Sequence, residues 1–306
     1  MAVTTPKEPK DFDDFWRQRY RNALTVDPQP HTQIISEDKL GWRVFDIRYT
    51  STDRFPIRGW LLLPASGVVK RGFIIGHGYG GRNEPDFHLP FHDAALLFPC
   101  FRGLGLSAQP AISSEPRWHV LHDINRKNRY ILGGCVEDLW LAVSAMLSLF
   151  PHIAGHLGYL GVSFGGGIGA MALAWESRIS RGHFNIASFG HQPLRLRLAT
   201  NGSAHSVQQY YCRHKKPTLK VLRYYDAALA AKRITLPIHC ACAKFDPCVA
   251  PPGQFAIYNA LPGEKQLYTL DAGHHNYPNQ TRQEQELIHE LDVFFAPLSA
   301  AIAQEI

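Results

Sequence analysis

A serine enclosed by glycines is the feature that most restricts how this chain can fold. Residues 157–175 read LGYLGVSFGGGIGAMALAW, and Gly161–Gly165 within them fits the pattern G-x-S-x-G around Ser163. In a nucleophile elbow this serine occupies strained backbone between a strand and a helix, where only small neighbours fit. An apolar run precedes the motif, and Ile168–Trp175 can form the helix after it. An ordinary glycine-rich turn is the alternative, because the pattern also arises by chance.

Apolar runs of strand length recur along the rest of the chain, each ended by glycine, proline or polar residues. We expect further strands at residues 44–49, 57–63, 72–76, 94–100, 184–188, 238–243 and 264–270, and helices at 11–21, 135–150, 254–261 and 283–295. The first two of these strands would form an antiparallel pair, whereas the later ones alternate with helices. The sequence therefore predicts an α/β fold with a mostly parallel twisted sheet and helices on both faces.

Length and composition favour one domain. A chain of 306 residues with 45% hydrophobic content can bury a large core. We expect a single domain over residues 1–306, with an N-terminal extension at about 1–65 and a cap or pocket insertion at about 190–226, where the periodicity is mixed. No apolar run approaches eighteen residues, and the polar start lacks the apolar stretch of a secretory signal. These features predict a soluble, cytoplasmic protein that does not enter a membrane.

Charge and cysteine content give no sign of nucleic acid or metal. The net charge of +6 is spread along the chain, and its one dense cluster, Arg213–Lys216, is short enough to be a solvated loop. Six scattered cysteines suit a reducing compartment better than a disulfide scaffold. Cys240 and Cys242 have the wrong spacing for a zinc knuckle, and we expect them on opposite faces of one strand. We therefore expect no metal and no cofactor.

Two side chains further along the chain complete a catalytic constellation with Ser163. Asp246 follows the predicted strand at 238–243, and His274 follows the one at 264–270. The order Ser, Asp, His is that of the α/β-hydrolases, in which the three groups meet at the carboxyl edge of the sheet. The histidine would accept the serine proton while the aspartate holds the imidazole in the required tautomer. The pattern predicts an α/β-hydrolase fold with Ser163, Asp246 and His274 as catalytic triad.

Each of the two later positions has a neighbouring competitor. His275 directly follows His274 and is either a polar pocket residue or the catalytic base itself. Asp271 competes with Asp246, although it lies so close to the histidine in sequence that the two would leave the same strand end. We favour His274 and Asp246.

Backbone N–H groups are the predicted oxyanion donors. A glycine-rich loop, His77–Gly81, follows the short strand at 72–76 and allows backbone to approach a ligand closely. Hydrolases of this kind take one donor from such a loop and the other from the residue after the nucleophile. We therefore expect the oxyanion hole to consist of the N–H groups of Tyr79 and Phe164, with a plain turn at Tyr79 as the alternative.

Two further segments are expected to support the site. Arg102 follows the strand at 94–100 and could pair with a carboxylate that braces the site, with Asp138 as one candidate. Residues 108–134 read as a long surface excursion whose histidines are hydrogen-bonded surface groups rather than metal ligands. The sequence assigns no substrate-binding side chain.

The chain resembles a known family, the acetyl xylan esterases and cephalosporin C deacetylases of carbohydrate esterase family seven. The matching stretches are DFDDFW, PIRGWLLLP, GHGYGG, FRGLGLS, YILGGCVEDLWLAVSAM, GVSFGGG, LRYYDAALAAKRITLPI, DPCVAPPGQFAIYNALPG and GHH. The resemblance implies a deacetylase of small O-acetyl groups on sugars or related alcohols, with the triad and oxyanion donors named above. It also implies a homo-oligomer, often a hexamer.

Several positions depart from the pattern usual in that family. Leu104 and Phe164 stand where the family has glutamine, and His275 stands where it has glutamate. One extra residue also separates Asp246 from the following pair of prolines. The triad is intact, and a backbone donor at Phe164 does not depend on its side chain. The departures change the polarity beside the nucleophile and therefore bear on the choice of substrate.

The sequence thus predicts a serine carboxylesterase that acts on small-molecule esters through an acyl-enzyme. One alternative is another hydrolase on the same scaffold, such as a peptidase or a dienelactone hydrolase, since the pocket sets the preference. A second alternative is a receptor that keeps the scaffold but has lost catalysis. Turnover of acetyl, longer acyl and peptide substrates separates the first two, and tight binding without turnover would identify the receptor.

Overall fold

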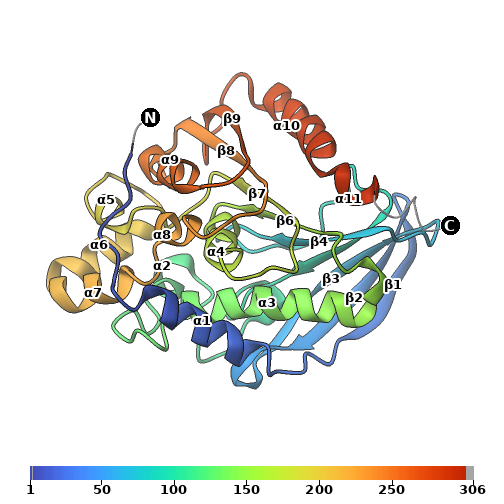
Figure 1. Cartoon of the computed structure of the whole chain (residues 1–306), viewed down its shortest axis with the longest axis horizontal. Helices are drawn as coiled ribbons and strands as arrows, with labels where there is room; N and C mark the ends of the chain where they lie inside the picture. Colours follow the sequence, from blue (N-terminus) through green and yellow to red (C-terminus); the bar gives the residue numbers. More distant parts are fainter. Residues whose placement is uncertain (2, 301–306) are drawn as a thin grey trace.

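The fold is built on one twisted sheet (Figure 1). The computed structural model describes residue 1 and residues 3–300. Over these residues nine strands pair in the order β1-β2-β3-β5-β4-β6-β7-β8-β9. They are β1 His31–Lys39, β2 Trp42–Thr50, β3 Pro56–Pro64, β4 Arg71–Gly76, β5 Ala94–Pro99, β6 Leu157–Val162, β7 Arg181–Asn185, β8 Ile238–Phe245 and β9 Lys265–Ala272. All pairings from β5 to β9 are parallel, which confirms the predicted sheet.

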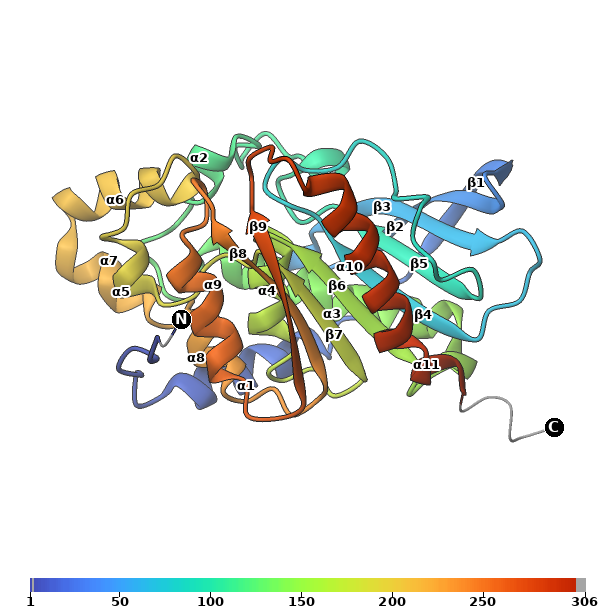
Figure 2. The ribbon, with the colours of Figure 1, turned by 90° about the horizontal axis from the view of Figure 1, so that it is seen from above.

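Helices cover both faces of the sheet (Figure 2). They are α1 Phe12–Ala23, α2 Pro116–His119, α3 Ile131–Leu149, α4 Phe164–Ala172, α5 Gln192–Arg195, α6 Ser203–Arg213, α7 Lys215–Leu222, α8 Ala227–Ala231, α9 Pro251–Ala260, α10 Gln280–Phe295 and α11 Pro297–Ala300, with short 3-10 turns at Thr52–Arg54, Gly105–Ser107 and Pro151–Ile153. One core contains residues of α1, α3, α4, α8 and α9, and the other contains residues of α10 and α11.

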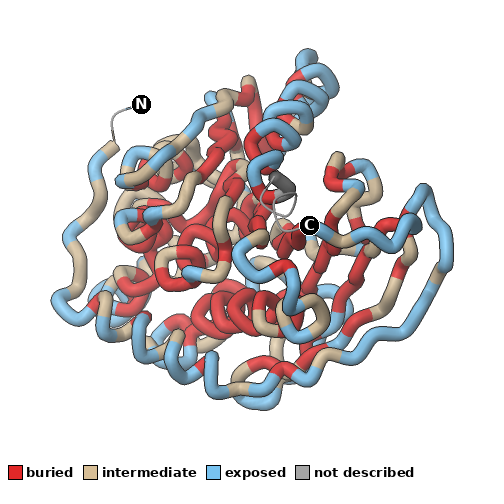
Figure 3. The backbone as a smooth tube through the Cα atoms, turned by 45° about the vertical axis from the view of Figure 1, so that its right-hand side comes forward, coloured by how far each residue is buried: buried red, intermediate tan, exposed pale blue. Residues whose placement is uncertain are grey.

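Strand alternation explains the two cores. Ala95 and Leu97 of β5 join the core with α3, whereas Leu96 and Phe98 join the core with α10. Successive side chains of a strand point to opposite faces, so a strand covered on both sides is apolar throughout. Figure 3 shows the buried centre of the sheet that results. Cys240 and Cys242, two residues apart on β8, pack in the same core, so the expectation that they face opposite sides was wrong.

The N-terminal part of the sheet is antiparallel. β2 and β3 pair as the sequence predicted, and β3 also pairs antiparallel with β5. The outermost strand, β1, was not predicted, because its sequence HTQIISEDK lacks the alternation of a half-buried strand. Almost all of it is exposed, including Ile34 and Ile35. It extends the sheet by backbone pairing with β2 rather than by burying side chains.

α3 is a core helix. Its length and apolar composition would suffice to cross a membrane, and no other helix among the described residues meets that test. Most of its residues are buried, and it contacts α1, α4 and strand β4. A helix that is apolar on all sides is what an interior position requires, so its composition is explained by packing.

Some predicted boundaries differ from the structure. α4 begins at Phe164 and ends at Ala172, earlier than the predicted helix at 168–175. β7 ends at Asn185, because Ile186 has a left-handed φ of 41° that turns the chain away from the sheet. Residues 190–226 fold mainly into α5, α6 and α7, which lie together beyond the end of the sheet that carries the site (Figure 2).

Candidate active site

The turn from β6 into α4 has the geometry of a nucleophile elbow. Ser163 has φ 53° and ψ −108°, a conformation unfavourable for a side chain with a Cβ. Its backbone N–H donates to the Asn185 carbonyl at 2.8 Å, which ties the strained residue to β7. A Cβ at Gly161 would lie 2.6 Å from the backbone of Gly165 across the turn, and a Cβ at Gly165 would lie 2.6 Å from the backbone of Gly76 at the end of β4. The glycines of the motif are therefore required by close backbone packing.

His274 lies between the other two candidate side chains. Its Nε2 is 2.8 Å from Ser163 Oγ, and its Nδ1 is 2.8 Å from Asp246 Oδ2. The histidine follows β9, and Asp246 follows β8, so adjacent parallel strands bring the two side chains to one edge. If Nδ1–H donates to the carboxylate, Nε2 is free to accept the serine proton, which is the tautomer a general base needs.

Asp246 is buried and fully hydrogen-bonded. Besides His274, it accepts hydrogen bonds from the N–H groups of Cys248 and Val249, both at 2.8 Å, and from Gln254 Nε2 at 3.0 Å. Gln254 is itself fixed, because its Oε1 accepts from the Ala243 N–H. The carboxylate is thus held in one orientation. No sequence pattern pointed to Gln254, because it reaches Asp246 only once α9 packs against β8.

The neighbouring competitors lie elsewhere. Asp271 pairs with Lys244 at 2.8 Å and accepts a hydrogen bond from Asn279, and these partners hold the pKa of Asp271 below its usual value. His275 lines the same cavity and packs its ring against Phe245, but it makes no hydrogen bond to Ser163 within the described part of the chain. The hydrogen-bond geometry therefore favours His274 and Asp246.

Two backbone N–H groups beside the serine are available as oxyanion donors. A Cβ at Gly78 would lie 3.8 Å from Ser163 Cβ, so the loop that carries Tyr79 runs next to the serine. Phe164 is the first residue of α4, where a backbone N–H has no partner within the helix. Neither the Tyr79 nor the Phe164 N–H donates a hydrogen bond to another described residue. Both are free to bind a reacting oxygen.

An aromatic cluster fills the space behind these donors. The Phe164 ring is fully buried, and its centroid lies 4.2 Å from that of the Tyr79 ring. It also packs against the rings of Phe101 and Phe189. Leu104 is buried in the same core. The positions that depart from the family's usual glutamines are therefore apolar and packed, whereas the backbone at Phe164 keeps its place at the start of α4.

His119 connects this cluster to a buried ion pair. Tyr79 Oη is 3.0 Å from His119 Nδ1, and His119 Nε2 is 2.9 Å from the Arg102 carbonyl. The carbonyl can only accept, so Nε2 carries the proton and Nδ1 accepts from the phenol. Burial lowers the pKa of His119 to about 4, which keeps the ring neutral. His119 was expected at the surface, and it is instead fully buried below the oxyanion loop.

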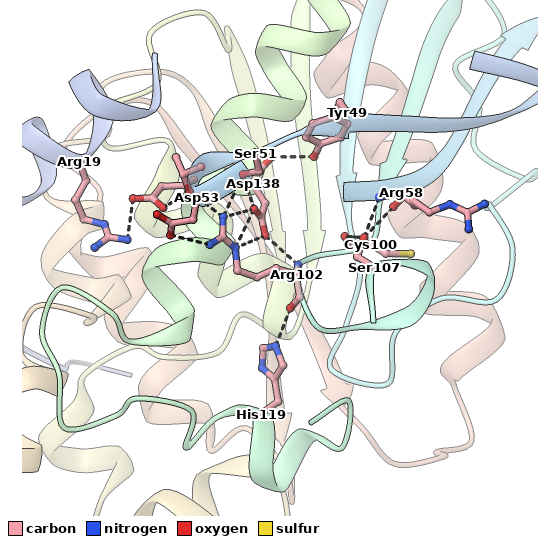
Figure 4. Close-up of polar contacts among 12 residues, drawn as sticks. Arg19, Tyr49, Ser51, Asp53, Arg58, Cys100, Arg102, Ser107, His119 and Asp138 are labelled. Carbon is pink, nitrogen blue, oxygen red and sulfur yellow. Dashed lines mark hydrogen bonds and ion pairs between the residues drawn. The ribbon is translucent and has the colours of Figure 1, made fainter. Parts of the chain in front are cut away.

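The brace predicted from Arg102 is present (Figure 4). Arg102 and Asp138 form an ion pair at 2.7 Å, and the Arg102 N–H donates to the same carboxylate at 2.9 Å. The guanidinium also donates to the hydroxyls of Ser51 and Thr52. Burial alone would lower the pKa of Arg102, but the attraction of Asp138 outweighs it and the pKa is raised. The pair joins α3 to the chain leaving β5.

The triad opens into a cavity of about 950 Å³. Its wall includes residues of the oxyanion loop, α2, α6 and the chain after β9. The wall is largely apolar, and it also carries polar side chains: Glu115, Arg117, Arg195, Asn201, Ser203, Ser206, Asn276 and Gln280. Cys248 also lines it, and its Sγ lies with ligand atoms of Asp246 and His274 within 4.8 Å of one another. These groups are already committed to hydrogen bonds, Cys248 donating to Asn201 Oδ1.

Sheet order, elbow and hydrogen-bonded side chains together are those of an α/β-hydrolase, and solved structures share this fold. An acetyl xylan esterase from Paenibacillus sp. R4 superposes with a TM-score of 0.82 at 21% identity, covering 94% of this chain and 96% of that one. Acetyl xylan esterase 1 from Thermoanaerobacterium sp. JW/SL YS485 gives 0.77 at 18% identity with the same coverage. An acylaminoacyl peptidase from Pyrococcus horikoshii gives 0.64 at 14% identity, covering 84% of this chain and 41% of that one.

The sequence identifies the family within that fold. The sequence model described as Acetyl xylan esterase (AXE1) matches residues 3–292, nearly the whole chain. The chain belongs to the acetyl xylan esterase family and is a carboxylic ester hydrolase. The predicted resemblance, fold class and enzyme class are thereby confirmed.

Proposed function

We propose that the protein hydrolyses small acyl esters, acetyl esters above all, of sugars or related alcohols through a Ser163–His274–Asp246 triad. The observation that carries the proposal is the pair of 2.8 Å contacts that His274 makes, through Nε2 to the serine and through Nδ1 to the aspartate. A serine hydroxyl is a weak nucleophile at neutral pH and needs an adjacent base held in the right tautomer. The family membership supports the ester as substrate.

The first half-reaction forms an acyl-enzyme. Ser163 Oγ attacks the ester carbonyl carbon as its proton passes to His274 Nε2, and Asp246 stabilises the imidazolium that results. The carbonyl oxygen becomes an oxyanion held by the N–H groups of Tyr79 and Phe164. One donor of this kind contributes roughly 3–4 kcal/mol to transition-state stabilisation in comparable hydrolases. His274 then protonates the leaving alcohol, and the bond from carbonyl carbon to alcohol oxygen breaks.

The second half-reaction releases the acid. Water enters the place of the alcohol, gives a proton to His274 Nε2 and attacks the acyl carbon, and the same donors stabilise the second oxyanion. Collapse of this intermediate returns the proton to Ser163 Oγ and frees the carboxylic acid. The cavity of about 950 Å³ is larger than an acetyl group requires, and the polar side chains set in its largely apolar wall can bind hydroxyls of the alcohol part.

Kinetics with p-nitrophenyl acetate test the triad. Ser163→Ala and His274→Ala should each lower kcat by about 10⁴–10⁶-fold, because the groups act as a unit, and wild type should show a burst of p-nitrophenol. Ser114→Ala and His289→Ala, at exposed positions, are the matched controls and should keep wild-type rates. Undiminished turnover in both triad variants would refute the proposal.

A further inference from the structure

Arg195 is a charged side chain without a counter-ion. It ends α5, and no carboxylate among the described residues lies within the 4.0 Å of an ion pair. Its polar contacts are two marginal ones at 3.5 Å, to Gln192 Oε1 and Ser203 Oγ. Its guanidinium also lies over the Phe189 ring, 5.0 Å from the centroid. This leaves most of its five N–H donors unused.

Other partly buried arginines of this protein are paired. Arg102 binds Asp138, Arg178 binds Glu176, and Arg233 binds Glu8, at 2.6–2.7 Å. Withdrawing a guanidinium from water without a partner lowers the stability of the fold, so the position of Arg195 requires an explanation. Arg195 differs from these arginines in one other respect, because it lines the catalytic cavity.

The surroundings of Arg195 keep it charged. Burial lowers the pKa of the guanidinium, while Tyr130, Tyr79 and Asp226 act in the opposite direction. An arginine remains protonated at neutral pH under such a shift. Asp226 is not a free partner, because its carboxylate accepts backbone N–H groups at the start of α5 and of α8. The positive charge therefore faces the cavity without an ion-pair partner of its own among the described residues.

A second positive element lies at the same wall. The first turn of α6 lines the cavity through Ser203 and Ser206, and its N-cap, Gly202, provides no side-chain cap. Unpaired N–H groups at a helix start favour an anion. Of the two glutamates that line the cavity, Glu115 is paired with Arg117 at 2.8 Å. The other, Glu284, belongs to α10, which lies away from α5 and α6 in Figures 1 and 2.

We propose that Arg195 determines specificity by binding a carboxylate carried by the ester substrate, so that the enzyme prefers anionic esters to their uncharged counterparts. The proposal rests on the esterase function proposed above and names a class of substrate for it. An arginine binds a carboxylate through two parallel N–H···O bonds, which fixes the orientation of the substrate as well as attracting it. A substrate carboxylate at this wall would be the ion-pair partner that Arg195 lacks among the described residues.

Two pairs of esters test the preference, and the members of each pair are matched in size but carry either a charged carboxylate or a neutral carboxamide. Monoethyl succinate and ethyl succinamate place a carboxylate or a carboxamide on the acyl side, whereas O-acetyllactate and O-acetyllactamide place it on the alcohol side. The measurement is the ratio of kcat/KM for the anionic ester to kcat/KM for the amide, obtained from acid release. Wild type should favour the anionic member of at least one pair, and that pair locates the carboxylate.

Variants at Arg195 connect that ratio to the guanidinium. Arg195→Gln should lower the ratio by about tenfold or more, since a bidentate charge-assisted contact is lost. Arg195→Lys, which keeps the charge but not the fork, should give an intermediate ratio. Arg197→Gln removes an exposed arginine two residues away and should leave the ratio at its wild-type value. A purely structural Arg195 would lower both rates together and leave the ratio unchanged.

A binding measurement makes the outcome independent of turnover. Succinate should bind wild type in calorimetry about tenfold more tightly than it binds Arg195→Gln. Equal rates within both pairs in wild type, or an unchanged ratio in Arg195→Gln, would overturn the proposal while the esterase function stands. Failure of the esterase proposal would give a different result: Ser163→Ala would still turn over p-nitrophenyl acetate.

Discussion

Two arginines near the catalytic cavity differ in how the fold balances their charge: Arg102 belongs to the brace, and Arg195 belongs to the helical wall of the cavity. Arg102 has Asp138, Ser51 and Thr52 as partners, and its pKa is raised. Arg195 has no carboxylate partner among the described residues, and its pKa is lowered. The charge of Arg102 is balanced within the fold, whereas the charge of Arg195 is available to bind a group on the substrate. The difference separates side chains that hold the site from those that select a substrate.

Breaking the Arg102–Asp138 pair and removing the charge of Arg195 should give the largest difference in stability between two variants. Asp138→Ala leaves the buried Arg102 guanidinium unpaired and should lower the free energy of unfolding by about 3–5 kcal/mol. Arg195→Gln removes no ion pair and should change it by less than about 1 kcal/mol. Urea unfolding at pH 7 measures both, with Arg197→Gln as the exposed control. Equal losses for the two variants would break the comparison, because Arg195 would then be structural as well.

The next largest effect should come from acid, through two buried histidines, His77 of the oxyanion loop and His119, whose Nε2 donates to the Arg102 carbonyl. Burial lowers the pKa of both His119 and His77 to about 4, from 6.5 when unfolded. The unfolded chain therefore takes up these protons more readily, so the contribution of the neutral rings is complete above pH 6.5 and is lost as the pH falls toward 4. The loss should reach at most about 3 kcal/mol for each ring.

Urea unfolding at pH 7 and pH 4.5 measures this loss. His119→Gln should have a smaller pH dependence than wild type, since one of the two buried rings is gone. His289→Gln, at an exposed position of α10, should keep the wild-type dependence. The same pH dependence in His119→Gln as in wild type would show that His119 does not contribute to it.

The sequence predicted the sheet and the order of the site residues because both depend on local pattern. Continuous apolar runs that end at glycine or proline mark strands buried on both faces, and each candidate site residue follows such a run. β1 lacked that signal, since it is exposed and held by backbone pairing. Residues 190–226 lacked it too, because they form short helices, and Pro193 and Pro217 lie in the first turns of two of them, so no long periodic run develops.

What the sequence could not supply is contact between distant segments. The choice between His274 and His275 needs the distance to Ser163 Oγ, which is set by how β9 lies beside β8. The roles of Gln254 and Arg195 follow only from the folded chain. Gln254 donates to Asp246, and Arg195 has no carboxylate partner among the described residues. The catalytic roles, the cytoplasmic location and the homo-oligomer stay predictions.

Covalent labelling tests the central claim most directly. A fluorophosphonate reacts only with a serine whose neighbouring base removes its proton. Mass spectrometry of the digested protein should find the label on the peptide that contains Ser163, formed rapidly in wild type and at least about a thousandfold more slowly in His274→Ala. Labelling of Ser163 at the same rate in both proteins, or a label on a different serine, would contradict the account.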